Sequence, residues 1–310
     1  MKLLLLTIFI ILNLNANIFD DAVKDFQNKS YLQAFNKFEK LALQDDINAQ
    51  YNTALIAYTG YKGVPRNLQK AFLWYEKAAK NGHMVAQNNL AHMYFMGEYV
   101  TKDIDKAIYW YKKSALQGYA LAQLNLAMLY ESKANKENLE KAFYWYKKAA
   151  NQNVIMAQNN LGEMYYHGKG VSKDISKAIK WFTKAANASN PVAQYNLALH
   201  YRQGDGVAVD VNKAIDLLTK SANANYLKAI VRLADLYREG KFVNQDYKKA
   251  FEFYKKAIEQ NSVKSIYYVG LMYYHGYGVK ADKRKAIQYM NEAKNMGYKR
   301  AANFLKVHNL

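Results

Sequence analysis

One pattern of small and apolar residues recurs along most of this 310-residue chain. Each unit opens on a small residue, and successive openings lie 35 to 37 residues apart. The openings are Ala49, Ala86, Ala122, Ala157, Ala193, Ala229, Ser265 and Ala301. Because a unit of this length cannot bury its apolar faces alone, it has to stack on its neighbours. The sequence therefore predicts an array of stacked repeats.

Each unit is predicted to contain two helices, named here helix A and helix B. In the second unit Ala86, Leu90, Met93 and Tyr94 follow the i, i+4, i+7, i+8 spacing of one helical face. A Lys-Ala pair occurs in helix B of every unit, at residues 70–71, 106–107, 141–142, 177–178, 213–214, 249–250 and 285–286. A glycine turn separates the two helices, because glycine adopts the positive φ that ends a helix. The third unit has lost this glycine. The predicted fold class is an all-α solenoid of helix-turn-helix repeats.

Residues 159–186 (NNLGEMYYHGKGVSKDISKAIKWFTKAA) carry nearly all of a longer pattern, AQxNLAxMYxxGxGVxxDxxKAxxWYxKAA. This pattern resembles the Sel1-like repeat, a relative of the tetratricopeptide repeat. The resemblance extends roughly over residues 49–310. It implies a right-handed α/α solenoid, and it implies a scaffold or adaptor that binds other proteins.

The repeat pattern divides the chain into a terminal segment at each end and seven full units. The seven repeats are predicted at 49–85, 86–121, 122–156, 157–192, 193–228, 229–264 and 265–300. Residues 17–48 are predicted to be an N-terminal half-repeat or cap of the tetratricopeptide type, because Ala34 lies 37 residues before Ala71. Residues 301–310 are predicted to form a C-terminal capping helix.

Residues 1–16 are predicted to be a secretory signal peptide that is cleaved after Ala16. Lys2 precedes an apolar run from Leu3 to Leu12, which is too short to span a membrane comfortably. An uncleaved anchor remains the alternative. We expect a protein that is exported to the periplasm or secreted, has no stable membrane span and is a monomer. The absence of cysteine excludes a lipoprotein, disulfides and thiolate metal sites.

The formal net charge of +19 raises the question of an anionic partner. The basic residues are scattered through the repeats, as in Lys112-Lys113 and Lys147-Lys148, and form no recognisable nucleic-acid motif. We interpret these pairs as the solvated face of helix B, and we expect no nucleic-acid partner. Attraction to an anionic envelope polymer is the alternative.

Few residues suggest chemistry. The six histidines form no HExxH motif and no paired spacing, so we expect no metal, no cofactor and no catalytic residue. Aspartates recur just before helix B and are predicted to cap its exposed amides: Asp103, Asp174, Asp210, Asp246 and Asp282. One helix B position holds Trp74, Trp110, Trp145 and Trp181 and continues as Leu217, Phe253 and Tyr289. Interchange with leucine favours core packing there over a platform for sugars.

The family resemblance implies one alternative function. Some secreted, cysteine-rich Sel1-like proteins have penicillin binding or β-lactamase activity attributed to them, so the alternative is a β-lactam-hydrolysing repeat protein. The residues of this chain do not support it. None of the nine serines is followed by lysine three residues later, and neither KTG nor GxSxG occurs.

The side of helix A opposite its predicted buried face is the candidate binding surface. Counting the opening small residue as position 1, this side contains positions 3, 7 and 10. Many residues there are aromatic or aliphatic and differ between repeats. If helix A lines the concave surface, as in tetratricopeptide solenoids, they form a groove for a protein or extended peptide; the alternative is lateral packing on the next repeat. The predicted partner-binding residues are Tyr51, Tyr58, His92, Phe95, Met128, Tyr166, Tyr195, Arg202, Arg238, Tyr267 and Tyr274.

Overall fold

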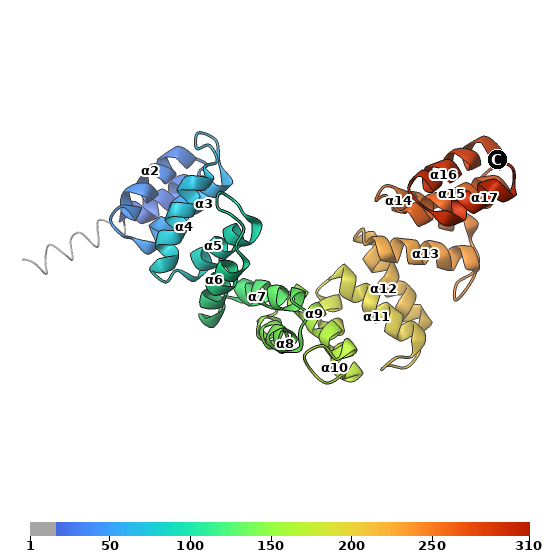
Figure 1. Ribbon diagram of the computed structural model, residues 1–310, viewed down its shortest axis with the longest axis horizontal. Helices are drawn as coiled ribbons and strands as arrows, with labels where there is room; N and C mark the ends of the chain where they lie inside the picture. Colours follow the sequence, from blue (N-terminus) through green and yellow to red (C-terminus); the bar gives the residue numbers. More distant parts are fainter. Residues whose placement is uncertain (1–16) are drawn as a thin grey trace, which may run out of the picture. The chain divides into compact units, whose positions relative to one another are not determined.

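The computed structural model describes residues 17–310, and the predicted signal peptide lies outside these residues. The described chain is helical throughout, apart from turns and one isolated bridge between Tyr61 and Val64 (Figure 1). It divides into two compact units at residue 154, and each unit is described by itself. This confirms the predicted all-α repeat fold.

The first unit contains a helix at residues 17–27 and then seven labelled helices. They are α2 (Tyr31–Ala42), α3 (Ile47–Thr59), α4 (Leu68–Lys80), α5 (Met84–Met96), α6 (Ile104–Leu116), α7 (Ala120–Ser132) and α8 (Lys136–Asn151). Each of α3, α5 and α7 packs on the helix that follows it, as the A and B helices of one repeat. The predicted N-terminal cap contains two helices, 17–27 and α2.

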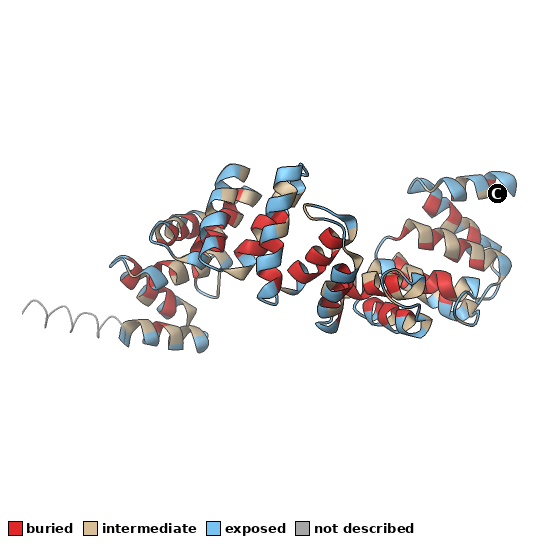
Figure 2. Ribbon diagram, turned by 90° about the horizontal axis from the view of Figure 1, so that it is seen from below, coloured by how far each residue is buried: buried red, intermediate tan, exposed pale blue. Residues whose placement is uncertain are grey.

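The second unit contains four further pairs and a final helix. They are α9 (Ile155–His167), α10 (Ile175–Asn187), α11 (Pro191–Gln203), α12 (Val211–Asn223), α13 (Leu227–Glu239), α14 (Tyr247–Ile258), α15 (Val263–His275), α16 (Lys283–Asn295) and α17 (Lys299–Val307). Helix α17 packs on α16 at the predicted capping position. In both units the buried residues lie along the helix faces that meet a neighbouring helix (Figure 2).

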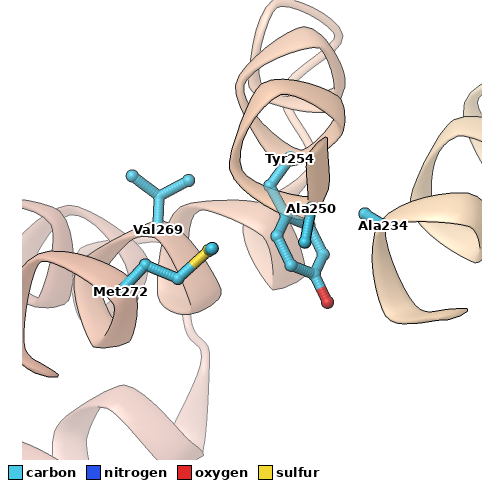
Figure 3. Packing of buried hydrophobic residues seen from close by; sticks show 5 residues of the cluster. All are labelled: Ala234, Ala250, Tyr254, Val269 and Met272. Atoms are coloured by element: carbon cyan, nitrogen blue, oxygen red, sulfur yellow. The ribbon is translucent and has the colours of Figure 1, made fainter. Parts of the chain in front are cut away.

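Small residues allow the helices to approach one another. The opening residues at position 1, from Ala49 to Ala301, are completely buried. Figure 3 shows the same principle in the second unit, where Ala250 and the ring of Tyr254, both of α14, lie between Ala234 of α13 and Val269 and Met272 of α15. Alanine leaves space between the backbones, and one large side chain fills it.

The caps that begin and end the helices follow from the sequence. The side chain of Asp174 accepts a hydrogen bond of 2.9 Å from the backbone N–H of Lys177, and the other four predicted aspartates cap their helices in the same way. Helices α5, α11, α13 and α15 end on left-handed glycines. In the third repeat, which has no glycine turn, Asn135 caps α8, and this helix is 16 residues long where α4 and α6 have 13. The predicted capping role of the aspartates is confirmed.

The second glycine of the turn is required for a different reason, because here the chain passes close to another helix. A Cβ on Gly206 would lie 2.3 Å from Cγ2 of Ile175 at the start of α10. A Cβ on Gly278 would lie 2.3 Å from the backbone of Tyr247 at the start of α14. These two turns therefore pack against helix B of the preceding repeat, so closely that a side chain at Gly206 or Gly278 would clash.

The lysine of the recurring Lys-Ala pair joins helix B to helix A of the same repeat. Its ammonium lies over the ring of a helix A tyrosine, at 4.3 Å for Lys213 and Tyr201 and at 5.2 Å for Lys249 and Tyr237. The same type of pair occurs in six of the seven repeats. Most of these lysines also lie within ion-pair distance of the capping aspartate, as at Lys177 and Asp174 (2.9 Å).

A glutamine at position 2 of helix A joins three helices, and the sequence interpretation missed it. The side-chain amide of Gln87 in α5 donates to the carbonyl of Ala79 in α4 (3.0 Å) and accepts from Gln117, which follows α6 (2.8 Å). Gln50 and Gln123 form equivalent networks. These glutamines are almost completely buried, so their polar groups depend on these partners.

In the fifth and sixth repeats, other residues replace part of this hydrogen-bond network. In the sixth repeat Ile230 stands at position 2, and the carbonyl of Ala222 accepts instead from the Lys256 ammonium (3.1 Å). In the fifth, Gln194 still donates to the carbonyl of Ala186, but Ala224 stands where the first three repeats place Asn or Gln. As a result, the side-chain oxygen of Gln194 is buried without a partner among residues 17–310.

We expect Gln87→Met to lower the free energy of unfolding by about 1–3 kcal/mol, because it leaves the buried carbonyl of Ala79 without its donor. Equilibrium urea unfolding measures this. The exposed Gln69→Met is the control and should change stability little. The reverse change, Ala224→Gln, supplies a donor to Gln194 and should stabilise the protein. Equal stabilities of the Gln87 and Gln69 variants would contradict the proposed role of the network.

The aspartate caps make stability dependent on pH. Hydrogen bonds from the helix backbone, chiefly the N–H of Lys177 for Asp174, hold the pKa values of Asp103, Asp174 and Asp246 below the ordinary value of 3.8. A carboxylate whose pKa is lowered in the folded state contributes stability above its unfolded pKa, and this is lost as the pH falls through the folded-state pKa.

We therefore expect Asp174→Asn to reduce the loss of stability between about pH 6 and about pH 3, because asparagine caps a helix without titrating. Urea unfolding at the two pH values measures the difference. Asp20→Asn, at an exposed residue outside the caps, is the control. An unchanged pH dependence in the Asp174 variant would contradict this assignment.

Candidate functional site

The predicted partner-binding residues divide into three groups in the structure. All lie on helix A, and all are partly buried except Met128, which is 45% exposed. Tyrosines at position 3 contact the segment that leads into the next repeat. Several residues at positions 7 and 10 border hollows between successive A helices. The remaining residues contact other side chains of the chain, apart from Arg202, for which the structure gives no such contact.

The position 3 tyrosines pack between repeats. The ring of Tyr51 stacks on that of His83, with 4.5 Å between ring centroids. Tyr195 meets Tyr226 edge to face at 5.5 Å, and Tyr267 meets Tyr298 at 5.1 Å. Each partner lies immediately before the next A helix. Lateral packing, the alternative interpretation of these positions, therefore describes the tyrosines at position 3.

One hollow of about 350 Å³ lies between α5 and α7 in the first unit. It brings together the predicted residues His92, Phe95 and Met128. The other residues that line it, which the sequence interpretation did not select, are Tyr111, Asn125, Leu129 and Ser132. Tyr111 comes from helix B and forms the deepest part, because it is 2% exposed. Burial raises the pKa of its hydroxyl, which is therefore neutral at physiological pH.

A second hollow of about 200 Å³ lies between α9 and α11 in the second unit and contains the predicted residue Tyr166. Its lining is more polar than that of the first hollow. It is completed by Glu163, His167, Phe182, Asn196, Leu199, His200 and Gln203. A smaller apolar hollow, lined in part by Phe26 and Leu55, lies between the helix at 17–27 and α3. Positions 4, 7 and 11 thus contribute to hollows between A helices.

Three predicted residues bind other side chains of the chain. The hydroxyl of Tyr58 donates to the Glu98 carboxylate (2.7 Å), and the Tyr274 ring contacts Phe304 of α17. Arg238 donates to the hydroxyl of Tyr254 (3.1 Å) and lies over the Tyr268 ring. These contacts within the chain give the three side chains a structural role.

Asp235 is at the centre of the contacts around Arg238. It is almost completely buried and accepts from the Tyr254 hydroxyl and from the Lys264 ammonium, each at 2.6 Å. A buried carboxylate requires such partners. This part of helix A is therefore an internal ion-pair network rather than an open polar surface.

The helix B position that holds the tryptophans is buried in some repeats and only partly buried in others. Trp145 and Leu217 are buried, but Trp74, Trp110 and Trp181 are only partly buried, so core packing describes part of this position. Trp74 and Leu73 of α4 border a hollow of about 480 Å³. The lysine pairs Lys112-Lys113 and Lys147-Lys148 are exposed, as expected for a solvated face.

Among residues 17–310, no three His, Cys, Asp or Glu side chains converge on a point that could hold a metal ion. In the same range, none of the helices combines the length and apolar character that crossing a membrane requires.

Comparison with known proteins assigns the repeats. The Sel1 repeat model matches seven consecutive segments, 47–83, 85–119, 120–154, 155–190, 191–226, 227–262 and 263–298. No curated protein matches the chain. The alternative function, β-lactam hydrolysis, gains no support from these comparisons.

Two solved structures share the fold over most of the chain. A Sel1 repeat protein from Oxalobacter formigenes is 28% identical, with a TM-score of 0.77, and the match covers 94% of this chain and 86% of that one. A protective antigen of uropathogenic Escherichia coli strains is 27% identical, with a TM-score of 0.80 over 87% of this chain. The present chain spans 58% of that antigen's length. With seven matched segments covering nearly all of residues 47–298, the chain belongs to the Sel1 repeat family.

Proposed function

We propose that this protein is an exported scaffold that binds a protein or an extended peptide along the hollows between its A helices. Sel1 repeat proteins typically act through protein–protein interaction. Hollows lined by helix A side chains, at residues 92–132 and 163–203, are the observation that carries the proposal. Separate hollows along a row of helices suit a ligand that presents successive side chains.

The lining varies between repeats, whereas the packing positions do not. Position 1 is alanine or serine in every repeat, but position 7 is Leu55, His92, Met128, Glu163, Leu199, Asp235 and Leu271 in turn. Selection for stacking alone accounts for the constant positions. A different side chain at each hollow would allow the scaffold to recognise one particular sequence of side chains.

The hollow between α5 and α7 has the composition of an anchor site for an apolar side chain. Phe95, Met128 and Leu129 supply apolar contacts, and Met128 is exposed although it is large and apolar. A flexible methionine adapts to different apolar partners. We expect this hollow to contribute much of the binding energy, because a few buried contacts dominate most interfaces.

We expect a photocrosslinking amino acid at Met128 to give a discrete adduct with a partner in the native cells. The same amino acid at Leu116, an exposed apolar residue at the end of helix B, is the control. Phe95→Ala should lower the yield of the Met128 adduct by roughly tenfold, because it removes an anchor contact. Gel shifts and mass spectrometry identify the adducts. The same adducts from both positions would contradict binding at this hollow.

Export rests on the sequence of residues 1–16. We expect the protein in the periplasm or the medium to have the intact mass of residues 17–310, which mass spectrometry measures directly. Ala16→Glu removes the small residue at the cleavage position and should leave the precursor uncleaved. A mature protein that retains residue 1 would contradict cleavage after Ala16.

A further inference from the structure

One histidine in the second unit stands at a position that is otherwise apolar. Position 8 of helix A is Ile56, Met93, Leu129, Met164, Leu236 and Met272 in the other six repeats, and all six are buried. In the fifth repeat it is His200, which is 5% exposed. A polar ring at such a position does not follow from packing, because isoleucine, leucine or methionine fills it in the other repeats.

Among residues 17–310, the structure gives a partner to one nitrogen of His200. Nδ1 lies 3.0 Å from the backbone carbonyl oxygen of Asp205 and 3.4 Å from its carboxylate, and both groups only accept. Nδ1 therefore carries a proton, and in the neutral tautomer that has this arrangement Nε2 is an acceptor. Among residues 17–310 the structure gives Nε2 no donor. His200 lines the hollow between α9 and α11, so the missing donor can come from a ligand.

The walls of this hollow favour a cation. The ring of Tyr166 meets that of His200 edge to face at 4.9 Å, and Phe182 lies at 5.7 Å on a tilted plane. The Glu163 carboxylate, partly exposed, accepts from Asn196 (2.5 Å) and lies 3.2 Å from Nε2 of His167. No lysine or arginine lines the hollow, although the chain contains 44 such residues and only 25 acidic ones. Lys173 lies over the Tyr166 ring, which shows that this ring accepts a cation.

We propose that the hollow between α9 and α11 binds an arginine side chain of the partner protein. The guanidinium offers five donors in one plane, which suit the Glu163 carboxylate, Nε2 of His200 and the amide oxygen of Gln203, while its flat face suits the aromatic walls. A lysine ammonium lacks this planar arrangement of donors. This assignment rests on the proposed function and adds the chemistry of the partner at this hollow.

The test uses two synthetic pentapeptides with blocked ends that differ only at the central residue. One carries arginine, and the other carries citrulline, which has nearly the same shape but no charge. Histidine NMR signals of the purified protein report binding at His167 and His200. We expect the arginine peptide to bind roughly tenfold more tightly than the citrulline peptide.

Two variants and one control locate the binding. Glu163→Gln should weaken binding of the arginine peptide by roughly tenfold. His200→Met should do the same, and it places there the residue type that three other repeats have at position 8. Glu252→Gln removes the same charge from an exposed residue of α14 and should leave binding unchanged. Circular dichroism checks folding; if the His200 variant does not fold, the Glu163 and Glu252 pair decides.

Three results would overturn the proposal. They are equal affinity for the two peptides, no histidine shift at about 10 mM arginine peptide, and equal binding by the Glu163 and Glu252 variants. The experiment requires no natural partner and probes the second unit, whereas crosslinking at Met128 probes the first. If no adduct forms at Met128 but the arginine peptide binds, the proposed scaffold function is rejected and the arginine site is kept. If the adduct forms but the arginine peptide does not bind, only the arginine site is rejected.

Discussion

In the first three repeats, stacking depends on a buried glutamine at position 2, whereas the sixth and seventh repeats have isoleucine there. Its amide reaches the last turn of the preceding helix B and accepts from the residue that follows helix B of its own repeat, as at Gln50, Gln87 and Gln123. Helix ends leave carbonyls without partners, and at a contact between repeats water cannot reach all of them. One side chain therefore supplies such a carbonyl with a hydrogen-bond donor and joins three helices.

Alanines, aromatic side chains and lysines supply the other contacts between neighbouring helices. Buried alanines at position 1 let helices A and B approach closely, and large residues such as Tyr254 fill the space that remains. Lysines over helix A tyrosines and aspartate caps hold the start of helix B in place. Because each contact joins only neighbouring elements, side chains that face the hollows can vary without disturbing the stack.

Equivalent positions of the repeat form hollows of different chemistry in the two units. The hollow next to Met128 is apolar with a tyrosine hydroxyl at its base, whereas the hollow next to Glu163 contains a carboxylate, two histidines and two amides. Both lie between successive A helices and use equivalent positions. Under the proposed function, each hollow would select its own side chain of the partner.

The sequence by itself determined the period, the pairs of helices, the aspartate caps, the glycine ends and the family, because each depends on residues within one repeat. It also selected His92, Phe95, Met128 and Tyr166, which border hollows. Only the tertiary structure decided that Tyr51, Tyr195 and Tyr267 pack between repeats, that Asn125 and Gln203 line hollows, and that His200 is buried. The physical reason is that these outcomes depend on contacts between different helices. A helical wheel gives the direction of a side chain around its own axis, but not which neighbouring side chain it meets.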